Sequence, residues 1–154
     1  MSDAQRSRNH RGAAAVETAL CLSFVVVPLV FAAISYAYMF TFRQSLSQST
    51  TEAARAAAVK AVSGTTAQRQ AAQTAAAQAA VAEAVGSFDS SLACGVHNLV
   101  CTVTFIPCPD VSPAGCVKVE VSYPYRDNAL VPTMPGLGFT LPGTVSYAAV
   151  AGVS

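Results

Sequence analysis

Residues 19–42 read ALCLSFVVVPLVFAAISYAYMFTF, and this stretch decides the fold because it contains no charged side chain. A helix needs about 20 apolar residues to cross the hydrocarbon core of a bilayer, so the stretch is long enough to span a membrane. Pro28 lies inside it, and membrane helices tolerate an internal proline better than helices in water do. The aromatic residues near its C-terminal end are Tyr36, Tyr38, Phe40 and Phe42. They predict an aromatic belt at the membrane–water interface.

Basic residues precede the apolar stretch at Arg6, Arg8 and Arg11. The positive-inside rule then places residues 1–12 in the cytoplasm and residues 43–154 outside. Two alternatives compete with this retained single-pass anchor: a secretory signal peptide and a buried helix of a soluble protein. A signal peptide has a shorter apolar region, of about 7–15 residues, which ends at a cleavage site of small residues. The sequence therefore favours a retained membrane anchor with its N-terminus in the cytoplasm.

The composition of the whole chain excludes other classes of protein. It is 53% hydrophobic and 11% charged, with a mean hydropathy of +0.44, whereas a soluble domain carries about 25% charged residues. So little charge argues against intrinsic disorder. Lys and Arg total 9 against 8 for Asp and Glu, a net charge of +1. Without a basic field we expect no nucleic-acid partner.

Glu17 is a carboxylate at the start of the apolar region. Such a group costs about 2.5–3.5 kcal/mol at the centre of a bilayer and less near the interface, so it needs a partner. In one interpretation it pairs with Arg11 at the interface. In the other, the chain is cut after Gly12, and Ala13 gains a free α-amino group. Residues four apart share a helix face, so this ammonium could neutralise the carboxylate of the same chain or of a neighbour.

The basic leader, Gly12, the small apolar residues 13–16 and Glu17 resemble a type IV prepilin signal. The wider string RGAAAVETALCLSFVVVPLVF, residues 11–31, resembles the start of TadE-like (TadE/TadF) pseudopilins of the tight-adherence (Flp) pilus system. Residues 43–61, RQSLSQSTTEAARAAAVKA, and residues 117–138, VKVEVSYPYRDNALVPTMPGLG, are similar to later parts of such proteins. Thr18 departs from the pattern, because many members carry an aromatic residue after the glutamate.

This resemblance implies a minor pilin or pseudopilin that lies in the bacterial cytoplasmic membrane and acts in pilus assembly. It implies cleavage between Gly12 and Ala13 by a membrane prepilin peptidase on the cytoplasmic face. The implied partners are that peptidase, the pilus assembly platform, other pilins or pseudopilins, and the membrane. The residues themselves show no phosphate loop, nucleophile elbow or zincin helix, so we expect no enzyme activity, catalytic residue, cofactor or small-molecule substrate. The alternative function is an uncleaved, membrane-anchored exported protein with an interaction domain.

Alanine dominates residues 53–85, and alanine is the best helix former. We expect the membrane helix to continue past Arg43 into a helical stalk over residues 43–86. One face of its first helix carries Leu46, Thr50, Ala53, Ala54, Ala57 and Ala61. Gly64 is a candidate C-cap, Thr65 or Thr66 a candidate N-cap, and the second helix should end at Gly86. The alanine faces predict either close helix packing or a solvated spacer.

The chain has five cysteines, and Cys21 lies in the apolar stretch as a small apolar residue. The other four are Cys94, Cys101, Cys108 and Cys116. An even number in a small exported domain predicts two disulfides, with three possible pairings. Cys108 and Cys116 bracket the turn-rich PDVSPAG, and pairing them would leave Cys94 with Cys101, the arrangement we favour. A zinc site and a catalytic thiol beside His97 are weaker alternatives, because the spacings exceed those of zinc ligands.

Residues 99–106, 117–123 and 145–150 are rich in β-branched and aromatic residues, and the first two alternate in polarity. They predict an antiparallel pair joined by the cysteine-bracketed loop, with a third strand. The Pro- and Gly-rich segment 123–143 predicts an irregular loop, through Pro132, Pro135, Gly136 and Gly138 among others. The predicted fold is α+β: a long transmembrane helix, an alanine-rich helical stalk and a small antiparallel sheet with disulfides. The predicted segments are 1–12 (leader), 13–42 (membrane helix), 43–86 (stalk) and 87–154 (β-rich distal domain).

Overall fold

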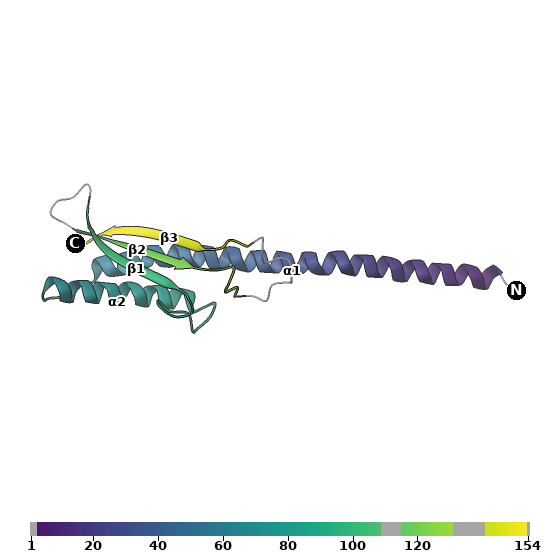
Figure 1. Cartoon of the computed structure of the whole chain (residues 1–154), viewed down its shortest axis with the longest axis horizontal. Coiled ribbons are helices and arrows are strands. Elements are labelled where there is room, and N and C mark those ends of the chain that lie inside the picture. The colour runs from purple at the N-terminus through teal and green to yellow at the C-terminus, as the bar shows by residue number, and fades with distance from the viewer. Residues whose placement is uncertain (1–2, 109–114, 131–140, 154) are drawn as a thin grey trace.

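The structure, a computed structural model, describes residues 3–108, 115–130 and 141–153, with residues 3–11 described by their backbone alone (Figure 1). Its elements in chain order are α1 (Asp3–Val59), α2 (Thr66–Val85), β1 (Val100–Pro107), β2 (Gly115–Tyr123) and β3 (Val145–Gly152). The N-terminal half of α1 projects alone, and its C-terminal half lies beside α2 and the sheet (Figure 1). The predicted α+β fold is therefore confirmed.

Local signals set the start and end of α2. The Thr65 hydroxyl accepts a hydrogen bond from the Gln68 N–H at 3.4 Å, and the Gln68 side-chain carbonyl accepts one from the Thr65 N–H at 2.9 Å. This reciprocal pair is a capping box, which satisfies donors that the helix itself leaves unpaired. At the other end the Gly86 N–H donates to the Ala82 carbonyl at 2.9 Å. The predicted cap at Thr65 and the predicted end at Gly86 are both confirmed.

The end of α1 differs from the prediction. The helix stops at Val59 and not at Gly64, and Ala61, assigned to the packing face, is exposed. The last buried residue of α1 is Ala58, and Val59 is 73% exposed. Helical structure in proteins depends mainly on packing of one face, so the helix ends where its packing ends.

Alanines form much of the contact between α1 and α2. Ala53, Ala54 and Ala57 of α1 are buried, as are Ala77 and Val81 of α2. Small side chains let two helix backbones approach closely, although each buries little apolar area. The two helices pack on each other, as the first of the two sequence interpretations proposes, and they do not form a solvated spacer.

The described sheet has the strand order β1–β2–β3 and is antiparallel throughout. Val119 at the centre of β2 lies opposite Val103 of β1 and Ala149 of β3. The inner face of the sheet is apolar and packs on the helices: β2 and β3 contact α1, and β1 contacts α2. On the outer face the Lys118 ammonium lies 3.1 Å from the Glu120 carboxylate. The predicted alternation in β2 is confirmed.

One core joins the segments predicted as stalk and distal domain. Leu46 and Ala57 of α1 belong to the same buried cluster as Val119 of β2 and Leu141 near β3. Residues 43–86 therefore form the helical layer of a two-layer domain whose other layer is the sheet. The predicted loop residues Pro132, Pro135, Gly136 and Gly138, and most of the loop between Cys108 and Cys116, lie outside the described residues.

Candidate functional site

The first candidate site is the exposed apolar part of α1. From Gly12 to Ile34 nearly all side chains are exposed, including Phe24 (79%) and Leu29 (63%). The helix is long and apolar enough to cross a membrane. Residues 13–34 would extend about 33 Å at a rise of about 1.5 Å per residue, which matches a hydrocarbon core of about 30 Å. The helix thus fits a single-pass membrane anchor.

Polar side chains in this exposed part are internally satisfied, with Glu17 as the exception. The Thr18 hydroxyl donates to the Ala14 carbonyl and the Ser23 hydroxyl to the Ala19 carbonyl, both at 2.9 Å. Within the described residues the Glu17 carboxylate has no hydrogen bond and no ion pair. Glu17 is therefore the position in the apolar segment that still requires a partner. The side chain of Arg11 is not described, so its pairing with Glu17 stays a prediction.

Gly12 lies where the fold itself does not require a glycine. A Cβ atom added there would meet nothing within 4 Å, and the backbone is helical. Glycine in a helix interior is less stable than alanine by about 0.5–1 kcal/mol. Neither packing nor backbone conformation explains this residue. The N-terminal end of α1 also lies far from α2 and the sheet (Figure 1).

An aromatic cluster joins the projecting helix to the domain. The Phe42 ring is fully buried, with its centroid 5.4 Å from Phe88, 5.3 Å from Tyr123 and 5.7 Å from Tyr125. The assignment of Phe42 to an interfacial belt is therefore wrong. Successive helix positions differ by about 100°, so Phe42 turns toward the sheet while Phe40 remains 56% exposed. The sequence pattern does not predict this cluster, because Phe88, Tyr123 and Tyr125 are distant from Phe42 in the chain.

The tyrosines of the cluster are held in their neutral form. Burial raises the pKa of Tyr123 and of Tyr125 above that of an ordinary phenol, and the nearby Asp89 carboxylate also raises the pKa of Tyr123. The Tyr123 hydroxyl donates a hydrogen bond to the Asn128 carbonyl at 2.8 Å. Hydrogen bonds from the Ser91 hydroxyl and N–H lower the pKa of Asp89. These groups order loops next to the cluster, and nothing in their geometry forms an acid–base pair.

The second candidate feature is the pair of disulfides. Cys94 is bonded to Cys101 and Cys108 to Cys116, the pairing that the sequence favours. Because all four sulfurs are in disulfides, none is available as a zinc ligand or a nucleophilic thiol. Among the described residues no group of histidine, cysteine or acidic side chains could hold a metal ion.

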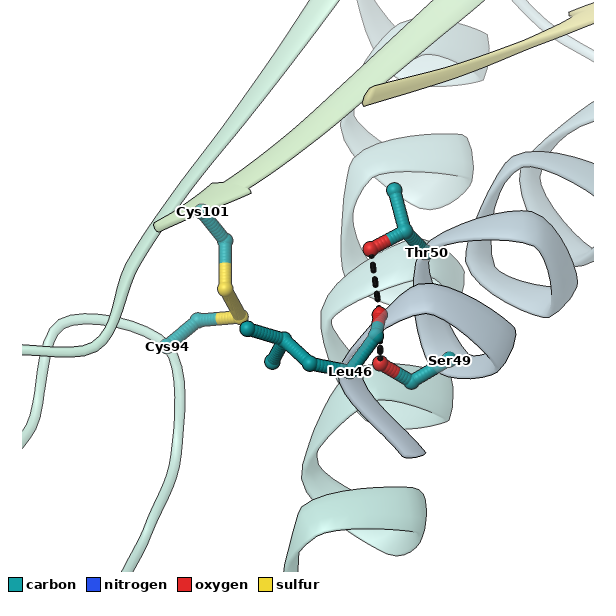
Figure 2. The surroundings of a disulfide bond; sticks show 5 residues. All are labelled: Leu46, Ser49, Thr50, Cys94 and Cys101. Carbon is teal, nitrogen blue, oxygen red and sulfur yellow. Dashed lines mark hydrogen bonds between the residues drawn. A yellow bond between two sulfur atoms is a disulfide. The ribbon is translucent and has the colours of Figure 1, made fainter. Parts of the chain in front are cut away.

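The Cys94–Cys101 disulfide packs on the first helix. Figure 2 shows the Leu46 side chain directed at this disulfide. The backbone carbonyl of Leu46 accepts hydrogen bonds from the Ser49 hydroxyl at 2.9 Å and the Thr50 hydroxyl at 2.7 Å (Figure 2). Buried hydroxyls are thus paired inside α1, which leaves the surface beneath the sheet apolar.

Removing either disulfide should destabilise the domain, and the two should differ. Closing a loop of seven or eight residues stabilises a fold by about 2.5 kcal/mol through chain entropy. The double variant Cys108→Ala/Cys116→Ala should lose about this much. The variant Cys94→Ala/Cys101→Ala should lose more, because it also opens a gap beside Leu46. Thermal unfolding of the full chain in detergent micelles measures both. Equal losses would show that packing against Leu46 contributes nothing.

Comparison with known proteins matches the N-terminal part of the chain. The model of the family described as TadE-like protein matches residues 12–55. The match begins at Gly12 and covers the exposed apolar segment, Phe42 and most of the α1 residues that pack in the domain. The resemblance noted from the sequence is thereby confirmed over this segment. No curated protein and no solved structure matches the chain.

Proposed function

We propose that this chain, with its TadE-like segment, is a minor pilin or pseudopilin that acts in assembly of a tight-adherence (Flp) pilus. The observation that carries the proposal is that Gly12 and Glu17 both lie near the start of the exposed apolar part of α1. That helix continues without a break into a folded domain (Figure 1). The family supports a structural, pilus-associated protein and not an enzyme. The basic leader supports a cytoplasmic N-terminus with residues 43–154 outside.

In this proposal a prepilin peptidase cuts between Gly12 and Ala13 at the cytoplasmic face. The new α-ammonium of Ala13 lies one helical turn from the Glu17 carboxylate, on the same face. In a low-dielectric membrane, two opposite charges attract far more strongly than in water. The ammonium of the same chain or of a neighbouring pilin then neutralises Glu17, the one group of the segment that lacks a partner among the described residues. The assembly platform and other pilins are the proposed partners.

The identity of the mature N-terminus tests this proposal. We expect N-terminal sequencing of the membrane-extracted chain to find Ala13 first when the prepilin peptidase is present. Without the peptidase the chain should keep residues 1–12. A chain that stays uncut in both cases would support the alternative, an uncleaved membrane-anchored exported protein with an interaction domain. A mature N-terminus at any other residue would overturn the prepilin interpretation.

Replacing Glu17 by glutamine should leave processing and folding intact and reduce assembly. The amide keeps the shape of the side chain but cannot neutralise an ammonium. We expect incorporation into pilus assemblies to fall by at least about tenfold, which corresponds to about 1.4 kcal/mol of association energy. Immunoblots of sheared pilus fractions against membrane fractions measure this ratio.

Glu52→Gln is the matched control for Glu17→Gln. Glu52 lies on the same helix but outside the apolar segment, with its carboxylate 3.6 Å from Arg55 in an exposed ion pair. Such pairs contribute about 0–1 kcal/mol, so assembly should be nearly unchanged. Normal assembly of Glu17→Gln would disprove the electrostatic role and leave the membrane anchor intact.

A further inference from the structure

The connection between α1 and α2 lies at the end of the domain opposite the N-terminus (Figure 1). A pocket of about 630 Å³ lies beside this connection. It lies between the α1–α2 connection, the first turns of α2 and the ends of β1 and β2. Ligand pockets in proteins measure about 300–1,000 Å³, so its size suits a short peptide segment or a small molecule. One wall is apolar and includes Phe105, Ile106 and Val153.

The charged side chains that are described around this pocket are all basic. Lys60 and Arg69 both line it, and none of its described lining residues is acidic. The ion pairs of the described chain are Arg55 with Glu52 and Lys118 with Glu120. Lys60 and Arg69 therefore face the pocket without a carboxylate from the described residues. Two such cations beside an apolar wall attract an anion.

A buried amide points to a bound group independently of the charges. Gln73 lines the pocket and is only 7% exposed. It stands on the buried face of α2 in line with Ala77, Val81 and Val85, where an apolar residue would be expected. The Gln73 side chain makes no hydrogen bond to any other described residue. Among the described residues, every side-chain nitrogen or oxygen atom that is closed off from solvent has a hydrogen-bond partner. The unpaired amide atoms of Gln73 are therefore not closed off. The amide therefore opens onto the pocket, where a ligand atom could pair with it.

We infer that this pocket binds a carboxylate carried next to an apolar side chain, on an extended segment of a protein partner. Lys60 and Arg69 would neutralise the carboxylate, and the Gln73 amide would donate a hydrogen bond to one of its oxygens. Phe105 and Ile106 would bury the neighbouring apolar group. This inference is independent of pilus assembly, because it rests on the geometry of the end farthest from Gly12.

The test uses the full chain, isotopically labelled, in detergent micelles. The probe is a blocked tetrapeptide of alternating leucine and glutamate, titrated while backbone amide shifts are followed by NMR. We expect saturable shifts centred on Lys60, Arg69, Gln73 and Phe105. The same peptide with glutamine in place of glutamate, and inorganic phosphate, should each bind at least about tenfold more weakly. Equal binding of the glutamine peptide or of phosphate would overturn the inference, as would the absence of saturation.

Three substitutions locate the binding. Arg69→Gln should weaken binding of the acidic peptide about tenfold. Gln73→Leu should weaken it several-fold while the melting temperature stays the same or rises, because leucine suits the buried face of α2. Lys118→Gln removes one positive charge from the outer face of the sheet, so it is the control for net charge and should leave binding unchanged. If Lys118→Gln weakens binding as much as Arg69→Gln, the peptide responds to overall charge and the pocket assignment is wrong.

Discussion

Replacing Phe42 by alanine should remove a large part of the stability of the folded domain. Phe42 is 0% exposed and its ring contacts Phe88, Tyr123 and Tyr125. Truncating a buried phenylalanine costs about 3–5 kcal/mol, because it loses apolar burial and leaves a cavity. The total free energy of unfolding of a domain is only about 5–15 kcal/mol. We expect the melting temperature of the full chain in micelles, followed by near-ultraviolet circular dichroism, to fall by at least about 10 °C.

Phe40→Ala is the matched control for this prediction. It removes the same ring two positions away on the same helix, where the side chain is 56% exposed. Its melting temperature should fall little, since exposed substitutions usually change stability by about 0.5 kcal/mol or less. If Phe40→Ala and Phe42→Ala are equally destabilised, the aromatic cluster does not connect helix and sheet. Phe42→Leu should be intermediate, because it keeps much of the apolar volume but none of the aromatic edge contacts.

Features encoded in neighbouring residues could be predicted from the sequence. Thr65 and Gln68 form the helix cap within three residues of each other, and Gly86 ends α2 by the same kind of local geometry. The strands follow from alternation that is visible over six or seven residues, as in Val117–Tyr123. The Cys108–Cys116 disulfide spans a single hairpin. Each of these depends on short separations along the chain, where residue preference and spacing carry most of the information.

Features that depend on the topology could not be predicted. Phe42 meets Tyr123 and Tyr125 because the sheet folds back over α1, so an aromatic residue expected at a membrane surface belongs to a core. For the same reason the exposed apolar part of α1 ends near Ile34 and not at Phe42. The pocket next to Lys60 and Arg69 likewise needs the α1–α2 connection to lie beside the ends of β1 and β2. Such contacts join segments that are distant in the chain, so a local sequence pattern cannot reveal them unless the order and pairing of the strands are also known.

For the N-terminal site, Gly12 and Glu17, the sequence pattern is more informative than the packing. Its proposed role comes from the sequence pattern and stays a prediction, and the structure adds a negative observation about packing. A Cβ atom added at Gly12 would meet nothing within 4 Å. Glu17 has no ion-pair partner in the described part of the chain. A residue that folding does not require can be tested by substitution without unfolding the protein. That property makes the maturation experiment decisive.

Gly12→Leu should slow maturation strongly while the chain still folds and inserts. The proposed scissile bond lies inside α1, so cleavage requires that helix to unwind locally, and glycine lowers the cost of unwinding by about 1 kcal/mol relative to alanine. Leucine restores helical propensity and adds a side chain that a small-residue subsite would reject. We expect the cleavage rate to fall by more than about tenfold. This corresponds to an increase of about 1.4 kcal/mol or more in the activation free energy. Intact-mass analysis of membrane extracts gives the ratio of uncut to cut chain.

Two further variants separate the causes of that loss. Gly12→Ala changes helical propensity with little added bulk, so cleavage should slow by about fivefold, the equivalent of about 1 kcal/mol. Ala33→Leu places the same leucine side chain at an exposed position of the same helix, far from the proposed bond, and should mature normally. If Gly12→Leu is cut as fast as the unaltered chain, Gly12 is not at the cleavage site. If Ala33→Leu is also blocked, the defect lies in membrane insertion and not in recognition by the peptidase.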